Sequence, residues 1–312
     1  MPAIQSWFAN ADLVGLASAT LIAATPLVLA ALGGVMSERS GVTNIALEGI
    51  MLTSAFAGFA LAFAVHNLAL GMLAAILAGM AIAALHAVLS IEFLVDQIVS
   101  GTVINILAVG VTGVFYRTLL QQGVRGPGTL SAWNVPVLSG IPVLGRVFFQ
   151  NAPITYLMMV LVVVVHLVLF NTVWGLRTRA CGEHPLAAET AGVNVKMVRY
   201  VNVIASGALG GLGGAYFTIQ QIGQFLPNMT GGRGFIALAA MIAGRWTPVG
   251  AVGASLLFAC ADALGARFQY LGVHVPPQIL SMLPYVLTIV VVAGAVGRAV
   301  APAAVGRPYR KS

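Results

Sequence analysis

The chain has 312 residues, of which 15 are Lys or Arg and 8 are Asp or Glu, so only 7% of its residues carry a formal charge. Soluble domains have roughly 25% charged residues, whereas 59% of this chain is hydrophobic and its mean hydropathy is +0.97. Because so few charges cannot cover the surface of a soluble fold, the composition excludes a cytosolic enzyme, a disordered protein and a disulfide-rich scaffold. It leaves a channel, a transporter or a membrane enzyme.

The net charge of +7 does not indicate a nucleic-acid partner, because the basic residues are scattered and form no Lys/Arg run. In a membrane protein such residues act as anchors on the cytoplasmic side. Cys181 and Cys260 lack the paired spacing of a disulfide framework or a metal site. We therefore expect neither a disulfide nor a bound metal.

Apolar runs without charges predict the membrane-crossing helices, since a helix needs about 20 apolar residues to cross the hydrocarbon core. The run 49–91 is long enough for two crossings, with His66 and Asn67 as the turn. The stretch 234–244 is too short to cross alone and predicts a half-helix or a short crossing. The other expected crossings lie near residues 13–34, 50–65, 69–90, 97–117, 153–173, 200–221, 249–264 and 278–297.

Charge asymmetry decides how many crossings to expect. If 234–244 counts as a crossing, the chain makes nine passes with the N-terminus outside and the C-terminus cytoplasmic, and ten of the 15 basic residues lie inside. We therefore expect an all-α polytopic membrane protein with about nine transmembrane helices. Its helices should be broken or short near 38–49 and 234–248.

Residues 1–312 are expected to form a single transmembrane domain. The long polar stretches are an external loop at about 118–152 and a cytoplasmic loop at about 174–199. Neither is large enough to fold as an ATPase or a substrate-binding domain. Transport energy and substrate capture, if they are needed, must therefore come from other chains.

The segment 37–49 places polar and charged groups between two apolar spans. It is either an ordinary polar loop or a broken segment whose backbone lines a cavity, because irregular backbone at membrane depth survives only in protein or in water. Glu48 stands beside an apolar run, where a carboxylate pairs with a cation or serves a pathway. Arg39 is its nearest available partner, although a Glu38–Arg39 pair or a capping role is equally open.

The next polar segment spans residues 92–105. Glu92 and Asp96 are four residues apart and would share a helix face as paired acids do, but we interpret both as markers of the inside end of a hairpin. Asn105 lies about two turns into the following span, where an amide must hydrogen-bond within the bundle or to a ligand. Interhelix bonding and substrate contact both stay open for Asn105.

The cytoplasmic loop contains a pattern typical of a short helix. Pro185 suits a first helical turn, and Gly192 suits the stop at the C-terminal end. Ala187, Ala188 and Ala191 give the helix a face of small residues. Such a helix would lie under the membrane, either as a docking element for a soluble partner or as a surface connector.

Glycines dominate the segment 206–215. Two small-xxx-small pairs overlap there, Gly207 with Gly211 and Gly210 with Gly214. Such pairs allow the backbone of a neighbouring helix to approach closely. Helix packing is the main interpretation, and a thin helix wall along a pathway is the alternative.

A second glycine-rich sequence, Gly231-Gly232-Arg233-Gly234, precedes the short apolar stretch. It resembles a phosphate-binding loop only superficially, because no G-x-x-x-x-G-K-[ST] motif exists and the lysines of the chain are Lys196 and Lys311. We therefore do not expect this chain to hydrolyse a nucleotide with such a loop.

Four motifs summarise these segments: Ser37-Glu38-Arg39-x-Gly41-x-x-Asn44-Ile45-x-x-Glu48-Gly49, Asp96-Gln97-x-x-x-Gly101-x-x-x-Asn105, Arg179-Ala180-x-Gly182-Glu183-His184-Pro185-x-Ala187-Ala188-x-x-x-Gly192 and Gly232-x-Gly234-Phe235-Ile236-Ala237-Leu238-Ala239. In this order they resemble the permease subunits of bacterial ABC importers in the branched-chain amino acid/ribose-type superfamily, in particular the nucleoside or simple-sugar branch. The resemblance covers roughly residues 25–265. His184, Ala46 and Arg245 depart from the family pattern.

The resemblance implies a multi-pass permease that pairs with a second, paralogous permease around one translocation path. Cytoplasmic ABC ATPase subunits would bind ATP and Mg²⁺, so that no cofactor belongs to this chain, and an extracytoplasmic binding lipoprotein would deliver the substrate. The loop at 182–192 resembles the coupling helix that sits in the ATPase cleft. Its implied coupling residues are Gly182, Glu183, His184, Pro185, Ala187, Ala188 and Gly192.

We therefore expect a non-enzymatic permease of the bacterial inner membrane that takes up a nucleoside by alternating access. ATP-driven closure of the partner subunits would push the coupling loop and tilt the helices. Asn44, Glu48 and Asn105 are the candidate polar groups on the path, where they would hydrogen-bond a ribose or a base edge.

Two alternatives remain besides a membrane enzyme, for which no nucleophile–base or metal-ligand spacing exists. The first is the same machinery carrying a simple sugar or a branched-chain amino acid. A zwitterion would require paired charges at depth, where the spans offer mainly Glu48 and Asp262. The second is an ion-coupled secondary transporter, which needs acid or His relays inside its spans. His86 and His166 each stand alone in apolar stretches and are interpreted as bundle histidines.

Overall fold

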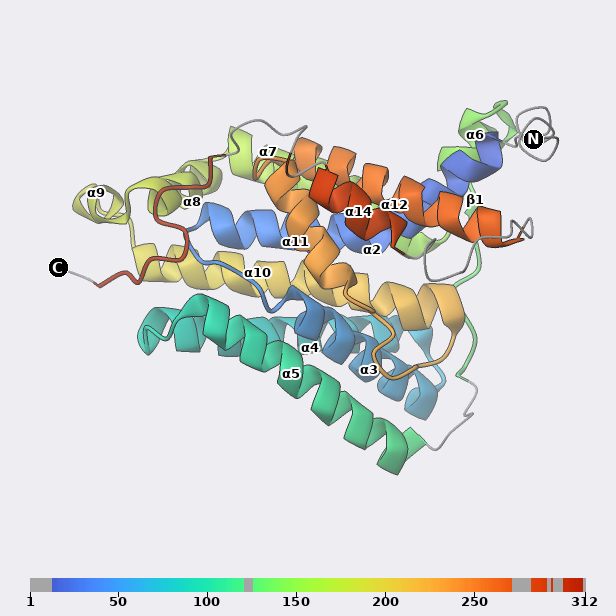
Figure 1. Cartoon of the computed structure of the whole chain (residues 1–312), viewed down its shortest axis with the longest axis horizontal. Coiled ribbons are helices and arrows are strands. Elements are labelled where there is room, and N and C mark those ends of the chain that lie inside the picture. Colours follow the sequence, from blue (N-terminus) through green and yellow to red (C-terminus); the bar gives the residue numbers. More distant parts are fainter. Residues whose placement is uncertain (1–12, 121–125, 271–281, 291–292, 294–299, 311–312) are drawn as a thin grey trace.

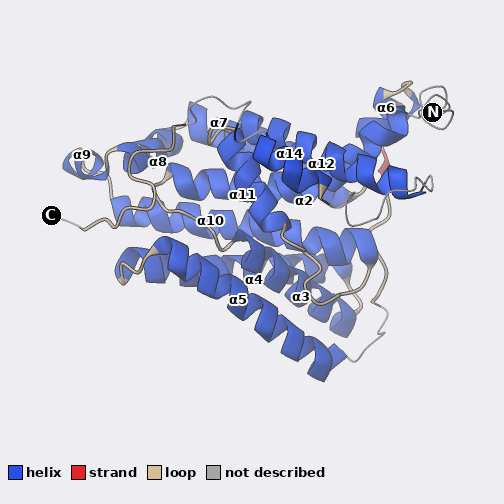
Figure 2. Cartoon of the chain, in the orientation of Figure 1, coloured by secondary structure: helices blue, strands red, loops and turns tan. Residues whose placement is uncertain are grey.

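The computed structural model describes residues 13–120, 126–270, 282–290, 293 and 300–310. These residues are almost entirely helical (Figure 2). The α-helices are α2 (Leu13–Arg39), α3 (Leu47–Val65), α4 (Leu68–Ala87), α5 (Gln97–Phe115), α6 (Leu144–Phe148), α7 (Pro153–Asn171), α8 (Val173–Glu183), α9 (Pro185–Thr190), α10 (Val195–Ala215), α11 (Arg233–Ala243), α12 (Pro248–Tyr270) and α14 (Leu283–Val290).

Short irregular elements complete this architecture. Three π-helical segments continue longer helices: η1 (Val88–Glu92), η2 (Tyr116–Leu120) and η4 (Tyr216–Ile222). The predicted external loop contains the 3-10 turn η3 (Leu138–Gly140), helix α6 and an antiparallel pair of strands, β1 (Trp133–Asn134) and β2 (Gln150–Asn151).

Six of the described helices are long and apolar enough to cross a membrane: α2, α3, α4 with η1, α5 with part of η2, α7 and α12. The chain is therefore an all-α polytopic membrane protein, as its composition predicts. The count of nine crossings is not confirmed, because α10 is not among the six, α11 has only 11 residues and the expected crossing at 278–297 lies partly outside the described residues.

The expected turn between the second and third spans is confirmed. His66 ends α3 with a φ of +50°, and Asn67 begins α4. The Asn67 side chain accepts hydrogen bonds from the N–H groups of Ala69 and Leu70, at 2.9 and 3.2 Å. An asparagine is one of the residues that best cap the N-terminus of a helix, so two residues set this tight connection.

Helix α10 is the centre of the bundle and packs against α2, α3 and α4. Its glycines lie where the helix backbones approach most closely. A Cβ at Gly207 would collide with the carbonyl oxygen of Gly79 in α4, and one at Gly214 would collide with the carbonyl oxygen of Met51 in α3. The two predicted small-residue pairs divide by neighbour: Gly207 and Gly211 face α4, and Gly210 and Gly214 face α3.

Residues 40–46, between α2 and α3, are not helical, yet most of them are buried. Side chains from other helices bind their backbone: Gln97 accepts the Thr43 N–H at 2.7 Å, and Asn105 donates to the Ile45 carbonyl at 2.9 Å. Further bonds of this kind join Ser37 Oγ to Val42 O, Arg199 Nε to Ser40 O and His86 Nε2 to Thr43 O. The segment is therefore the broken helix of the two predicted alternatives, with its backbone satisfied by protein.

The two ends of the long axis carry different elements (Figure 1). Helices α8 and α9 and the C-terminal residues 300–310 lie at one end. Strand β1 and helix α6, from the predicted external loop, lie at the other end, where α2 begins. Helices α2, α10 and α12 connect the two ends, and α3 and α11 begin near the middle of the long axis.

Candidate functional site

Glu48, in the first turn of α3, is buried against the beginning of α11. Its carboxylate accepts hydrogen bonds from the Thr230 hydroxyl at 2.6 Å, from the Gly232 N–H at 2.8 Å and from the Gly234 N–H at 2.6 Å. The N-terminus of a helix presents N–H groups without helical partners and a partial positive charge, so it stabilises a carboxylate. This contact ties together two helices that begin in the interior of the bundle.

Arg39 is not the partner of Glu48, which corrects the expectation drawn from the sequence. Its Nε donates to the carbonyl oxygen of Trp246 at 2.7 Å, and the indole N–H of Trp246 donates to the Glu38 carboxylate. The last turn of α2 thus packs against the turn between α11 and α12. The extended residues 40–46 carry Glu48 away from this corner to the N-terminus of α11.

The two asparagines of the predicted pathway set also have partners within the chain. Asn105 bridges α5 and α3, because its Oδ1 accepts the Gly49 N–H at 2.7 Å while its Nδ2 donates to the Ile45 carbonyl. The Asn44 Nδ2 donates to Ser206 Oγ, in α10, at 2.9 Å. All three predicted pathway side chains are buried. These contacts hold the broken segment in place, and a role of the three residues on a substrate path stays a prediction.

Sequence reasoning missed the residues that hold Glu48. Thr230, Gly232 and Gly234 lie 182 to 186 residues farther along the chain. Gly234 has no room for a side chain, because a Cβ would lie 2.5 Å from the Cα and N atoms of Glu48. A signal existed in the glycines around Arg233 at the beginning of a helix, since such a start can bind an anion.

The predicted coupling residues 182–192, which we call the coupling segment, form the end of α8, the helix α9 and the turn after it. Helix α9 begins at Pro185, and Gly192 has a φ of +82°, as expected for the first turn and the stop. Leu186, 58% exposed, adds an apolar side chain that the sequence analysis did not single out. The predicted set divides by exposure: Gly182 and Ala188 are buried, Pro185 is half-buried, and Glu183, His184, Ala187 and Gly192 are exposed.

The buried side of the coupling segment is anchored to the bundle. A Cβ at Gly182 would collide with the carbonyl oxygen of Arg39, so α8 abuts the end of α2. Ala188 lies in an apolar cluster with Cys181, Val195, Val198 and Tyr309. Burial raises the pKa of the Cys181 thiol to about 11, which keeps it a neutral packing group. A force applied to α9 therefore reaches α2 and α10 directly.

The C-terminal residues bind the same segment. The Ala304 N–H donates to the Gly182 carbonyl at 2.8 Å, and the Ala303 N–H donates to the Glu183 carboxylate at 3.1 Å. The guanidinium of Arg199, a buried residue of α10, lies 5.5 Å from the ring centre of Tyr309. The tail therefore connects the coupling segment to the central helix.

Two grooves flank α9 on its exposed side. One, of about 540 Å³, lies between α9 and the C-terminal tail, and the other, of about 440 Å³, lies between α8 and α9. Ala187 and His184 line both grooves. The coupling segment thus presents a short helix of small and apolar residues with a recess on each side.

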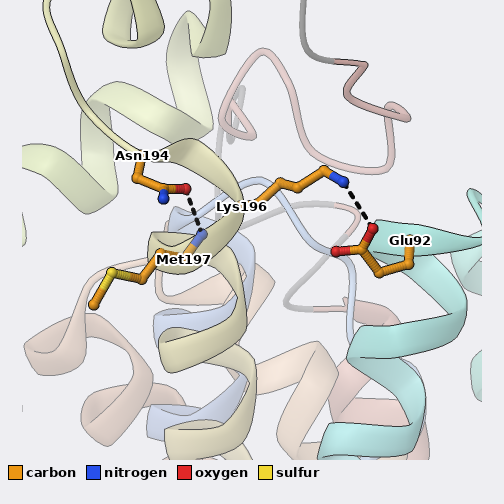
Figure 3. Close-up of polar contacts among 4 residues, drawn as sticks. All are labelled: Glu92, Asn194, Lys196 and Met197. Carbon is orange, nitrogen blue, oxygen red and sulfur yellow. Dashed lines mark hydrogen bonds and ion pairs between the residues drawn. The ribbon is translucent and has the colours of Figure 1, made fainter.

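The junction between the coupling segment and α10 is fixed by polar contacts (Figure 3). Asn194 accepts the Met197 N–H at 3.1 Å and caps α10, and Lys196 forms an ion pair with Glu92 at 2.7 Å. Asp96 caps α5 through the N–H groups of its first turn. Glu92 and Asp96 therefore mark the end of a hairpin, as predicted, rather than an acid pair.

Comparison with known proteins follows the same pattern as these contacts. Residues 16–292 match the family described as branched-chain amino acid transport system / permease component. The chain is 43% identical over 304 residues to the guanosine ABC transporter permease protein NupQ of Bacillus subtilis, with 94% of this chain and 95% of NupQ covered. It is 41% identical over 302 residues to the nucleoside ABC transporter permease protein NupC of Lactococcus lactis, with the same coverage.

A third relative is named for a sugar. The putative glucose ABC transporter permease protein TsgC13 of Haloferax volcanii is 37% identical over 306 residues, with 91% of this chain and 92% of TsgC13 covered. No solved structure is significantly similar to the chain.

Proposed function

The chain belongs to the family of branched-chain amino acid transport system permease components, and on this premise we propose that it is the membrane subunit of an ATP-driven importer of nucleosides. The relatives that are 41% and 43% identical are named for nucleoside and guanosine transport, whereas the relative named for glucose is 37% identical. This order is the observation that favours a nucleoside over a simple sugar or a branched-chain amino acid.

The mechanism follows from the position of the coupling segment. It stands at the end of α10, and α10 packs against α2, α3 and α4. Close-packed helices transmit a displacement with little compression. When ATP closes the partner ATPase subunits around α9, α10 and its neighbours tilt together and exchange outward for inward access.

Three kinds of partner complete the importer. A cytoplasmic ABC ATPase binds the exposed residues of the coupling segment and carries the ATP and Mg²⁺, so this chain itself is a non-catalytic subunit without a cofactor. A second, paralogous permease forms the other half of the path. An extracytoplasmic binding protein delivers the nucleoside to the end that carries β1 and α6, in the bacterial inner membrane.

An ion-coupled transporter is a weaker explanation of the same bundle. A proton relay needs titratable side chains that are free to exchange protons. Both ring nitrogens of His86 are hydrogen-bonded within the chain, to Ser100 Oγ at 3.0 Å and to the Thr43 carbonyl at 2.9 Å. These contacts give His86 a structural role.

Uptake measurements test the proposed function. Cells without nucleoside uptake of their own, expressing this chain with its ATPase, second permease and binding protein, should accumulate radiolabelled guanosine. Excess glucose or leucine should not compete, and omission of the ATPase should abolish uptake. Guanosine transport by the purified chain alone in liposomes, or uptake that depends on the proton gradient instead of the ATPase, would contradict the proposal.

The coupling segment has its own test. Ala187→Arg places a long charged side chain where both grooves meet, so we expect at least about a tenfold loss of co-purified ATPase, equivalent to about 1.4 kcal/mol, with an unchanged thermal midpoint. Asn134→Arg, an equally exposed position at the opposite end, is the matched control and should retain the ATPase. Equal ATPase recovery from both variants would place the docking surface elsewhere.

A further inference from the structure

An ion pair within the bundle is not used by any contact described so far. Arg233, the first residue of α11, and Asp262, past the midpoint of α12, place Nη2 and Oδ2 3.8 Å apart. The side chains are 36% and 32% exposed. Charged groups at membrane depth face protein or water rather than lipid, because transfer to hydrocarbon costs several kcal/mol. The exposed side of this pair therefore faces a water-filled or protein-lined space.

The geometry of the pair leaves it able to bind a third group. At 3.8 Å the contact is electrostatic and exceeds the length of a hydrogen bond. A guanidinium presents several donors and a carboxylate several acceptor positions. A hydroxyl group can accept from the one and donate to the other, so two neighbouring hydroxyl groups match the pair.

Aromatic side chains border the same place. Tyr285, in α14, is 47% exposed, and its hydroxyl donates to the Gly231 carbonyl at 3.2 Å, two residues before Arg233. On the other side, the Arg233 guanidinium lies 5.5 Å from the ring centre of Phe217 in η4. An exposed ring beside a pair of opposite charges suits a ligand that has one flat apolar face and one hydroxylated edge.

The contact of Glu48 with α11 fixes this arrangement. Glu48 binds the N–H groups of Gly232 and Gly234, which flank Arg233 in the sequence. The first turn of α11 is therefore held by its backbone, and the Arg233 side chain is aimed at Asp262 from a rigid base. Glu48 acts here as a positioning residue and does not itself contact the exposed space, because it is only 5% exposed.

We propose that Arg233, Asp262 and Tyr285 form a binding site for the nucleoside on the translocation path. The guanidinium donates to the ribose 2′ and 3′ hydroxyl oxygens, the carboxylate accepts their protons in hydrogen bonds, and the tyrosine ring packs against the base. This inference rests on the proposed function and assigns the substrate contact to residues other than the buried Asn44, Glu48 and Asn105.

Direct binding to the permease separates this site from that of the binding protein. Saturation-transfer difference NMR on the purified complex of both permeases and the ATPase, without the binding protein, uses guanosine and 2′,3′-dideoxyguanosine as probes. In the unmodified complex we expect guanosine to bind at least about tenfold more tightly, because the dideoxy probe lacks charge-assisted hydrogen bonds.

Three variants test the assignment. Asp262→Asn and Arg233→Gln should each weaken guanosine binding about tenfold and remove the preference over the dideoxy probe. Tyr285→Ala should weaken the binding of both probes and keep the preference. Gln269→Ala, an exposed position on α12, is the control and should change neither. Thermal midpoints of all variants identify any loss of folding.

Two results would overturn the inference. If Asp262→Asn and Arg233→Gln keep the preference for guanosine, the ribose does not contact the pair. If the exchanged pair, Arg233→Asp with Asp262→Arg, restores full uptake, the pair is a structural bridge. In both cases the unmodified importer still takes up guanosine, so the proposed function survives, whereas failure of the unmodified importer to take up any nucleoside would refute both.

Discussion

Single polar residues hold the irregular parts of this bundle together. Glu48 joins α3 to α11, Asn105 joins α5 to α3, and Arg199 joins α10 to the broken segment and the C-terminal tail. Inside a membrane protein no water replaces such partners, so an unsatisfied backbone group costs several kcal/mol. The charges that the sequence retains in its spans are therefore concentrated where the helical hydrogen bonding is interrupted.

Glu48→Gln tests this conclusion at the scale of one residue. The carboxylate accepts three hydrogen bonds, whereas an amide would direct an NH₂ group at one of the N–H donors of α11. We expect the free energy of unfolding to fall by about 2 to 3 kcal/mol, seen as a lower midpoint of thermal unfolding in detergent.

The matched control is Glu92→Gln, which removes a carboxylate from the exposed pair with Lys196. Exposed pairs contribute about 0 to 1 kcal/mol, so this variant should unfold close to the unmodified protein. A Glu48→Gln variant of full stability that has lost uptake would instead show that Glu48 acts on the substrate path.

At the scale of the element, α10 is stabilised by its neighbours more than by its own hydropathy. Its first turns carry Lys196 and Arg199, and its second half is rich in glycine. A helix surrounded by protein needs close backbone approach rather than a lipid-facing surface. The same helix carries the coupling segment at one end, so its packing is also the link between the motor and the bundle.

Gly207→Ala tests the close contact of α10 with α4. The added methyl group would collide with the backbone of Gly79 and with Ala83, so the helices must separate. We expect a loss of about 1 to 3 kcal/mol of stability, measured as a lower midpoint of thermal unfolding, together with reduced ATP-driven uptake.

Gly253→Ala in α12 is the control for this substitution. No atom lies within 4 Å of a Cβ at that position, and alanine favours a helix over glycine by about 1 kcal/mol. The control should therefore be as stable as the unmodified protein or slightly more stable. If both alanines had the same effect, close packing at Gly207 would not be what α10 requires.

At the scale of the whole molecule, the coupling segment and the C-terminal tail share one end, and the predicted external loop occupies the other (Figure 1). Arg307 and Arg310 lie in this tail, and basic residues favour the cytoplasmic side. The arrangement thus supports a cytoplasmic tail beside the site of ATPase docking.

Reporter fusions check this orientation. A green fluorescent protein fused to the C-terminus should fluoresce, and an alkaline phosphatase fused at the same position should be inactive, because it folds only outside the cytoplasm. An alkaline phosphatase placed in the external loop near Asn134 should be active. The opposite result for the two phosphatase fusions would reverse the proposed topology.

The sequence predicted those features that depend on neighbouring residues. Hydropathy and charge predicted the helical membrane fold, and the turn at His66 and Asn67 followed from local chemistry. Pro185 and Gly192 likewise predicted both limits of the coupling helix. The number of crossings did not follow, because α10 and α11 owe their positions to burial in protein and not to their own length or hydropathy.

The partners of the buried charges could be decided only by the tertiary structure. By sequence distance, Arg39 was the natural partner of Glu48, but the fold brings to it the N-terminus of a helix more than 180 residues away. It likewise places Arg233 beside Asp262 and Tyr285, which no local spacing relates. Composition and periodicity determine where a segment lies relative to lipid, whereas a charge is stabilised by whichever dipoles and charges the packed helices bring within a few ångströms.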